Sequence, residues 1–243
     1  MNINLKPNQQ RAQYALWILL LLVLIKVVAI VTFYLQYHLL DQWMNGAMVD
    51  MDAAEANDRR VLIVGLFDIV VRIATIIAVI LWFRRAYFNL HLRFQNLTYS
   101  EGWAAGGWFV PFMSLVVPYQ IFNDLFIQTK QFLKKFDIPE RNKLNDTLLI
   151  IWWLVWICNT ISQNIFKRFT RSETDVEKLA NYTLFDIGFT AVDVIALVML
   201  IAIIKAYSEI EPIFHSKLDE EKDQQAEQDR LNKIWETDPV ELS

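Results

Sequence analysis

Cysteine and histidine are scarce in this chain of 243 residues, which contains one cysteine and three histidines. Cys158 stands alone in an apolar run, so one chain can build no disulfide framework and no CxxC redox pair. His38, His91 and His215 fall in separate segments, and none stands at helical spacing from a second ligand of a metal motif. We therefore expect no metal site and no cofactor.

Positive charge is not in excess, because 23 Lys and Arg residues face 27 Asp and Glu residues. Phosphate binding relies on clustered Lys and Arg with a positive balance, so we expect no nucleic-acid partner. The sequence also lacks GxSxG, HExxH and GxGD-like motifs, and we expect a protein that is not an enzyme.

Apolar residues, by contrast, make up 55% of the chain and include 9 Trp and 16 Phe. This is more apolar surface than a soluble core of this length needs, and the charged residues gather in a few blocks. A lipid bilayer imposes such segregation. The lipid bilayer is therefore the expected partner, with other membrane proteins or a second copy of the chain as further candidates.

Four stretches reach the roughly 20 apolar residues that a membrane helix needs. They cover residues 14–36, 61–83, 147–166 and 184–207. The first exceeds the length of a signal-peptide core and is followed by no small-residue cleavage site, which indicates a retained span. The predicted fold is an all-α, polytopic membrane helix bundle.

A fifth hydrophobic segment, residues 103–126, contains Pro111 and Pro118 and follows Gly102. Proline frees backbone groups that must find partners within protein or in a wet cavity. We expect a broken helix near Pro111 that either re-enters the membrane or forms a fifth span. It acts either as a kinked packing hairpin or as a gate.

Orientation follows from Lys and Arg in the short loops, which stay on the cytoplasmic side. This places residues 1–13 and a charged tail, residues 208–243, in the cytoplasm, on either side of a transmembrane domain over residues 14–207. The alternating charges of the tail suit a solvated helix or a disordered arm, with docking of a partner as the alternative.

Charged residues within the spans cost about 2.5 to 3.5 kcal/mol each and usually pair in the bundle interior. Lys26, Asp68, Arg72 and Asp193 fall at similar depths, and their charges cancel. We predict one buried polar cluster joining the first, second and last spans. The alternative is that Asp68 and Arg72 pair within their helix, Lys26 snorkels and Asp193 is protonated.

Polar residues also follow one face of the span 147–166. They are Asn159, Ser162, Gln163 and Asn164. Hydrogen bonds of such residues hold neighbouring helices together, and the same stripe could instead line a proton or ion path or a ligand site.

Three short blocks lie in order between residues 83 and 121. They are Arg84-Arg85-Ala86-Tyr87-Phe88-Asn89-Leu90, then Gly102-Trp103-Ala104-Ala105-Gly106-Gly107-Trp108-Phe109-Val110-Pro111, then Pro118-Tyr119-Gln120. This order resembles the bacterial multi-spanning membrane family called domain of unknown function 4328, with Glu101 where the resemblance leads us to expect proline. The resemblance implies a bacterial inner-membrane location and no known activity, so it assigns no role to any residue.

The residues themselves suggest a structural role for the first block. Arg84, Arg85 and Arg93 follow the span 61–83, where they can snorkel to anionic headgroups while Tyr87 and Leu90 cover an apolar face. This predicts an interfacial anchor.

The function that the sequence favours is a non-enzymatic membrane scaffold or regulatory module, because no reactive constellation is visible. The alternative is a small transporter or channel that uses the intramembrane charge cluster.

Overall fold

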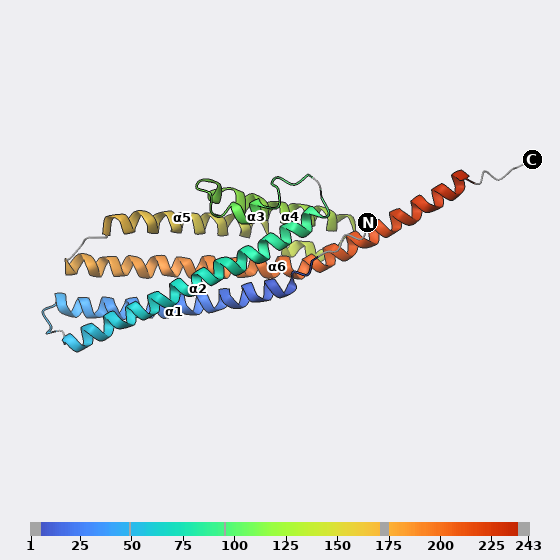
Figure 1. Cartoon of the computed structure of the whole chain (residues 1–243). Coiled ribbons are helices and arrows are strands. Elements are labelled where there is room, and N and C mark those ends of the chain that lie inside the picture. The colour runs from blue at the N-terminus through green and yellow to red at the C-terminus, as the bar shows by residue number, and fades with distance from the viewer. Residues whose placement is uncertain (1–5, 49, 95, 171–174, 238–243) are drawn as a thin grey trace, which may run out of the picture.

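The computed structural model describes residues 6–48, 50–94, 96–170 and 175–237, and all regular elements in these ranges are helical (Figure 1). The long helices are α1 (Gln9–Met44), α2 (Met51–His91), α4 (Val117–Lys135), α5 (Asp146–Thr170) and α6 (Val176–Thr237). Three short elements join them: α3 (Trp103–Gly106) and the 3-10 helices η1 (Met113–Leu115) and η2 (Pro139–Lys143). The all-α prediction is confirmed.

Four stretches of the described chain are long and apolar enough to cross a membrane: Gln9–Met44, Met51–His91, Pro139–Arg168 and Val176–Ile234. The prediction of four spans is therefore confirmed. At about 1.5 Å per residue, α1 and α2 each exceed the roughly 30 Å of a hydrocarbon core, so both continue beyond it. The segment 103–126 is not among the four.

The four long spans lie side by side, with α1 packed along both α6 and α2, and α5 on the other side of α6 (Figure 1). Both termini point toward the same end of the bundle, which we call the terminal end. The opposite end carries the connections α1–α2 and α5–α6. The short helix α3 and the longer α4 cover the terminal half beside α5.

The glycine and proline segment is broken near Pro111, as predicted. α3 ends at Gly106, and α4 begins only at Val117. Phe112, between them, has a φ of 62°, a left-handed backbone conformation that ends any helix at this point. Pro118 breaks no helix, because it lies in the first turn of α4, where a backbone N–H would have no acceptor within the helix.

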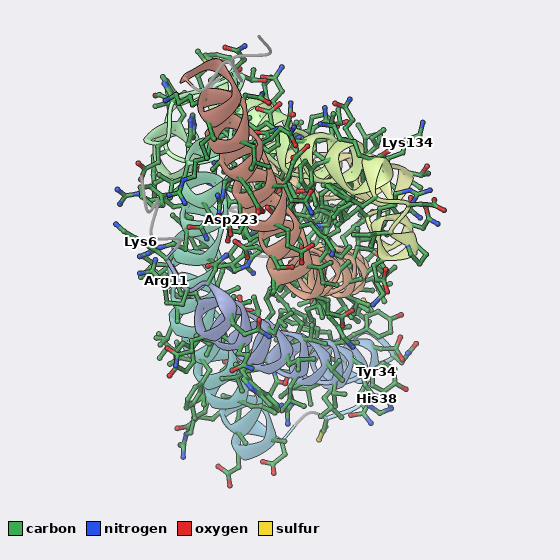
Figure 2. All side chains as sticks on the ribbon, turned by 90° about the vertical axis from the view of Figure 1, so that its right-hand side faces the viewer. Lys6, Arg11, Tyr34, His38, Lys134 and Asp223 are labelled. Carbon is green, nitrogen blue, oxygen red and sulfur yellow. The ribbon has the colours of Figure 1, made fainter. Side chains whose placement is uncertain are left out.

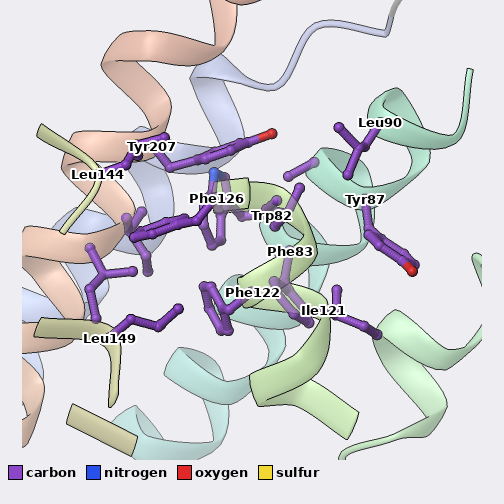
Figure 3. Packing of buried hydrophobic residues seen from close by; sticks show 14 of the residues in the cluster. Trp82, Phe83, Tyr87, Leu90, Ile121, Phe122, Phe126, Leu144, Leu149 and Tyr207 are labelled. Atoms are coloured by element: carbon purple, nitrogen blue, oxygen red, sulfur yellow. The ribbon is translucent and has the colours of Figure 1, made fainter. Parts of the chain in front are cut away.

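The largest buried side chains lie between α2, α4 and α6 at the terminal end (Figure 3). The rings of Phe83 and Phe122 are 4.3 Å apart, and those of Phe126 and Tyr207 are stacked at 6.5 Å. Burying such side chains contributes about 1.5 to 3 kcal/mol each. The tightest packing is thus an aromatic core at the end of the bundle.

This core corrects the prediction of an interfacial anchor. Tyr87 and Leu90 are fully buried in it rather than covering a membrane surface. The side chain of Arg93 is only 2% exposed, and its guanidinium lies 2.5 Å from the carboxylate of Asp219. Arg84 remains exposed, 3.5 Å from Glu101. The sequence alone does not separate an apolar face that meets lipid from one that packs in a protein core, because apolar side chains are favourable in both environments.

α6 also crosses the expected boundary at residue 207 without a break. Ile210, Phe214 and Leu218 are buried in the same core. The helix changes direction where it leaves the bundle (Figure 1), and it contains Pro212, whose ring removes one backbone hydrogen bond. Residues 208–218 therefore belong to the packed domain, and the solvated part of the helix begins after them.

Candidate functional site

The structure brings Lys26, Asp68, Arg72 and Asp193 together. The ammonium of Lys26 lies 3.0 Å from Asp68 and 3.3 Å from Asp193. The guanidinium of Arg72 lies 2.9 Å from Asp68 and 3.9 Å from Asp193. Each cation thus faces both carboxylates, and the local alternative of an isolated Asp68–Arg72 pair does not describe the arrangement.

Lys26 is the centre of this charge cluster. Its side chain is 7% exposed, against 44% for that of Arg72. Arg72 reaches Asp68 because the two stand one turn apart on α2, whereas Lys26 must be delivered by α1 and Asp193 by α6. The Lys26–Asp68 contact is an ion pair without the angle of a hydrogen bond. The cluster therefore ties three helices together through one buried ammonium.

α5 adds a neutral layer around Asp193. The amide of Asn159 donates to its carboxylate at 2.6 Å, and that of Gln163 donates to the same oxygen at 3.2 Å. Asn159 also donates to the carbonyl of Phe189 at 3.2 Å. The four-residue spacing of Asn159 and Gln163 predicts that both lie on one face of α5. The sequence did not reveal that both donate to Asp193. Asn164 instead bonds within α5, to the carbonyl of Thr160.

Two cavities meet at the charge cluster. The inner cavity, of about 370 Å³, lies toward the terminal end and is lined mainly by Leu22, Val79, Trp108, Trp152, Ala196 and Leu200. The outer cavity, of about 240 Å³, lies toward the opposite end and includes Gln163, Lys167, Asp186 and Thr190. Lys26, Arg72 and Asp193 line both. The cluster is thus the common wall of the two cavities.

The glycine-rich block of the motif supplies part of the inner cavity. Trp108 and Phe109 line it, and the Trp108 ring packs edge-on against Trp153 and Trp156 at about 6 Å. A Cβ on Gly107 would stand 2.7 Å from a methyl carbon of Val117, so this position needs glycine. The segment between α3 and α4 therefore folds back against α5, beside the charge cluster.

Other residues of the motif hold this segment in place. Tyr119 packs on Trp153 at 6.2 Å between ring centroids, and the hydroxyl of Tyr99 bonds Gln120. Trp103 packs against Tyr99. Gly102 and Gly106 have open space around them, and Pro111 is exposed. These residues support the cavity wall, and none of them reaches the charge cluster.

The first block of the motif makes buried polar contacts at the terminal end. The Tyr87 hydroxyl lies 2.9 Å from the carbonyl oxygen of Tyr99 and 3.2 Å from the carboxylate of Asp124, so its single proton has two acceptors within reach. Arg85 is half-buried. The prediction that Arg85 extends to headgroups stays a prediction.

Asn89 belongs to a polar network that sequence reasoning missed. Its amide donates to the carboxylate of Glu211 at 3.0 Å, and Asn8 donates to the other oxygen at the same distance. The His215 ring lies 3.7 Å from Glu211. All four side chains are buried, so the network ties α1, α2 and α6 together beside the aromatic core. The sequence placed Glu211 in the charged tail, for which we expected a solvated position, so it gave no sign that this carboxylate is buried.

The described residues include no group of three or more His, Cys, Asp or Glu side chains that could hold a metal ion. The arrangement brings two cations and two carboxylates into mutual contact.

Four apolar helices in one bundle define a multi-spanning membrane protein. A family model described as Domain of unknown function (DUF4328) matches residues 45–209, well over half of the chain, and the chain belongs to this family. The resemblance carried by the three blocks is confirmed, and the match extends beyond them through the last span. A search of curated proteins and a search of solved structures each found no match.

Proposed function

We propose that this is a small, non-enzymatic transporter or channel, in which the charge cluster controls passage of an ion, a proton or a small solute between the two cavities. The observation that carries the proposal is that one neutral cluster forms the wall between an inner and an outer cavity. We place the protein in the bacterial inner membrane with both termini in the cytoplasm, because Lys and Arg concentrate near the terminal end.

The cluster has the properties of a reversible barrier. Its two cations and two anions cancel, so the closed state avoids the cost of an isolated charge in the membrane. Lys26 contacts both carboxylates, and Asp193 has amide donors from Asn159 and Gln163 in addition. Asp193 can therefore lose a cationic partner and still keep two hydrogen bonds. A proton or cation that binds Asp193 would weaken its ion pairs with Lys26 and Arg72, and the remaining hydrogen bonds would keep the free-energy cost of this opening modest.

Reconstituted liposomes provide the test. We expect purified protein to accelerate the collapse of a proton, sodium or potassium gradient, followed with an entrapped ion-sensitive dye, relative to empty liposomes. Asp193→Asn should reduce this flux to the level of empty liposomes, because it removes the carboxylate that both cavities share. Asp58→Asn is the matched control, since this exposed residue lies near the start of α2 and outside both cavities.

If Asp193→Asn gives the same flux as the wild type, the charge cluster does not lie on the transport pathway. A wild-type protein that moves none of the three ions faster than empty liposomes would contradict ion transport itself.

The second candidate is the scaffold or regulatory module, and α6 is the observation that favours it. After Leu218 the helix continues to Thr237 beyond the bundle (Figure 1). Its exposed charges suit a soluble docking surface for another membrane protein or a second copy of the chain. Truncation after Lys222 discriminates the two: flux should survive it, whereas co-purification of a partner should not.

A further inference from the structure

The inner cavity has an apolar body and a charged end. Leucine, valine, isoleucine and tryptophan side chains from α1, α2, α5 and α6 form the body. Thr75 and Thr160 are the uncharged polar side chains of the lining, and the charged end consists of Lys26, Arg72 and Asp193. A cavity of this kind matches a ligand with one polar head and one apolar tail.

The charged end is biased toward anions. Both cations and one carboxylate, Asp193, line the inner cavity. Asp68, about 3 Å from both cations, contacts them from the side of the outer cavity, so it neutralises their charge without blocking their inner face. The guanidinium of Arg72 makes both of its carboxylate contacts through one nitrogen, 2.9 Å from Asp68 and 3.9 Å from Asp193, and its side chain is 44% exposed. A planar guanidinium with free N–H groups is suited to bind a carboxylate. The head of the matching ligand is therefore anionic.

The rim of the inner cavity opens toward lipid. Ile76, Phe109 and Thr160 line the cavity, and each is exposed on the outside of the bundle. All three lie on or beside the spans, so in a bilayer this rim faces acyl chains rather than water. The volume of about 370 Å³ is near the small end of the roughly 300 to 1,000 Å³ of ligand sites, which admits one chain rather than two.

We propose that the inner cavity binds a single-chain amphiphile with a carboxylate head, a fatty-acid-like anion that enters from the bilayer. Its head lies between Arg72 and Lys26, and its tail lies along Trp152, Trp156 and Leu200. The inference deepens the proposed function by naming a substrate class, and it rests on that function only in treating the charge cluster as a ligand site. Binding can occur whether or not the ligand is moved.

Tryptophan fluorescence measures this binding directly, because Trp108, Trp152 and Trp156 line the cavity. The protein is placed in nanodiscs of phosphatidylcholine and titrated with a bromine-labelled fatty acid, which quenches nearby tryptophans. We expect saturable quenching that unlabelled palmitate reverses. The fatty alcohol and the trimethylammonium amphiphile of equal chain length should not reverse it, since they lack the anionic head.

Two pairs of variants separate the cavity from the lipid background. Thr160→Phe fills the cavity from its exposed rim and should abolish saturable quenching, whereas Ile161→Phe, one residue along and outside the lining, should not. Arg72→Gln should weaken binding about tenfold or more, as expected for loss of a charged hydrogen-bond donor. Arg72→Lys keeps the charge and should recover most of the affinity.

Equal saturable quenching in the wild type, Thr160→Phe and Arg72→Gln would overturn the proposal. Competition by the cationic amphiphile as strong as that by palmitate would overturn the assignment of charge. Competition by phosphatidylglycerol equal to palmitate would overturn the single-chain assignment. Saturable binding in nanodiscs without ion flux in liposomes would contradict ion transport alone and leave this inference standing.

Discussion

Gly106 and Gly107 are neighbours in the motif, yet the structure needs glycine at only one of them. Gly107 packs against Val117 at the start of α4, and its missing side chain lets the segment fold back on α5. Gly106 faces open space. Of the two, Gly107 alone is required by a close approach of its neighbours. Two glycines look alike in a sequence, because the requirement comes from what packs against the Cα atom.

This difference predicts the outcome of a pair of alanine substitutions. Gly107→Ala should lower stability by about 1 to 3 kcal/mol, since the new methyl group would stand 2.7 Å from Val117. Gly106→Ala should be neutral or slightly stabilising, because alanine is the better helix former and meets no neighbour. Thermal unfolding in one detergent, compared with the wild type, measures both. Equal losses in the two variants would mean that the segment does not fold back as described.

At the scale of the elements, the contacts that order the bundle are polar as well as apolar. The charge cluster joins α1, α2 and α6 in mid-bundle, and the Asn89–Glu211 network joins the same three helices at the terminal end. In lipid, apolar packing alone gives helices little preference for one register over another. Two sets of polar contacts at different depths fix both the register and the rotation of α1, α2 and α6 relative to one another.

Lys26 should therefore show strong coupling with Asp68. Lys26→Met leaves two carboxylates facing Arg72, and we expect a loss of roughly 3 kcal/mol or more, as for removal of one partner of a buried pair. Lys26→Met combined with Asp68→Leu leaves the neutral pair Arg72–Asp193 and should recover part of that loss. Thermal unfolding in detergent compares the two variants.

Lys134→Met provides the control, because this exposed lysine on α4 lies far from the cluster in the fold and should be silent. If the double variant is no more stable than Lys26→Met, the buried ammonium does not hold the two carboxylates as the distances indicate.

The whole molecule has two unlike ends. The terminal end contains the aromatic core, α3, α4 and the extension of α6 (Figure 1). Among the described residues, the opposite end carries the α1–α2 connection, and the outer cavity lies toward it. Viewed from the terminal end, Lys6 and Arg11 lie on one side of the bundle, and Lys134 lies at the far edge of the α4 region (Figure 2). Basic residues at this end favour a cytoplasmic position.

Labelling with an impermeant maleimide should place the two ends on opposite sides of the membrane. In a chain whose Cys158 is replaced by serine, Met48→Cys should react in intact cells, because Met48 is fully exposed in the α1–α2 connection. Lys134→Cys should react only after lysis. Ser172, between the last two predicted spans, is expected on the same side as Met48 and lies outside the described residues. Reaction of both cysteines in intact cells would contradict the four-span topology with α4 in the cytoplasm.

The sequence by itself determined the class, the spans and the broken segment. Long, largely apolar runs leave few structures other than membrane helices, and glycine and proline act on the local backbone, so these features follow from neighbours in the chain. It also predicted which four charges meet, because depth along a helix can be counted in residues.

The tertiary structure alone decided what covers each apolar face. The buried positions of Tyr87 and Arg93, the acceptor shared by Asn159 and Gln163, and the network around Glu211 all depend on partners far along the chain. The two cavities on either side of the charge cluster depend on gaps between helices, which no local pattern encodes. A side chain excluded from water looks the same in a sequence whether it meets lipid, an aromatic core or a cavity, and only packing in three dimensions separates these environments.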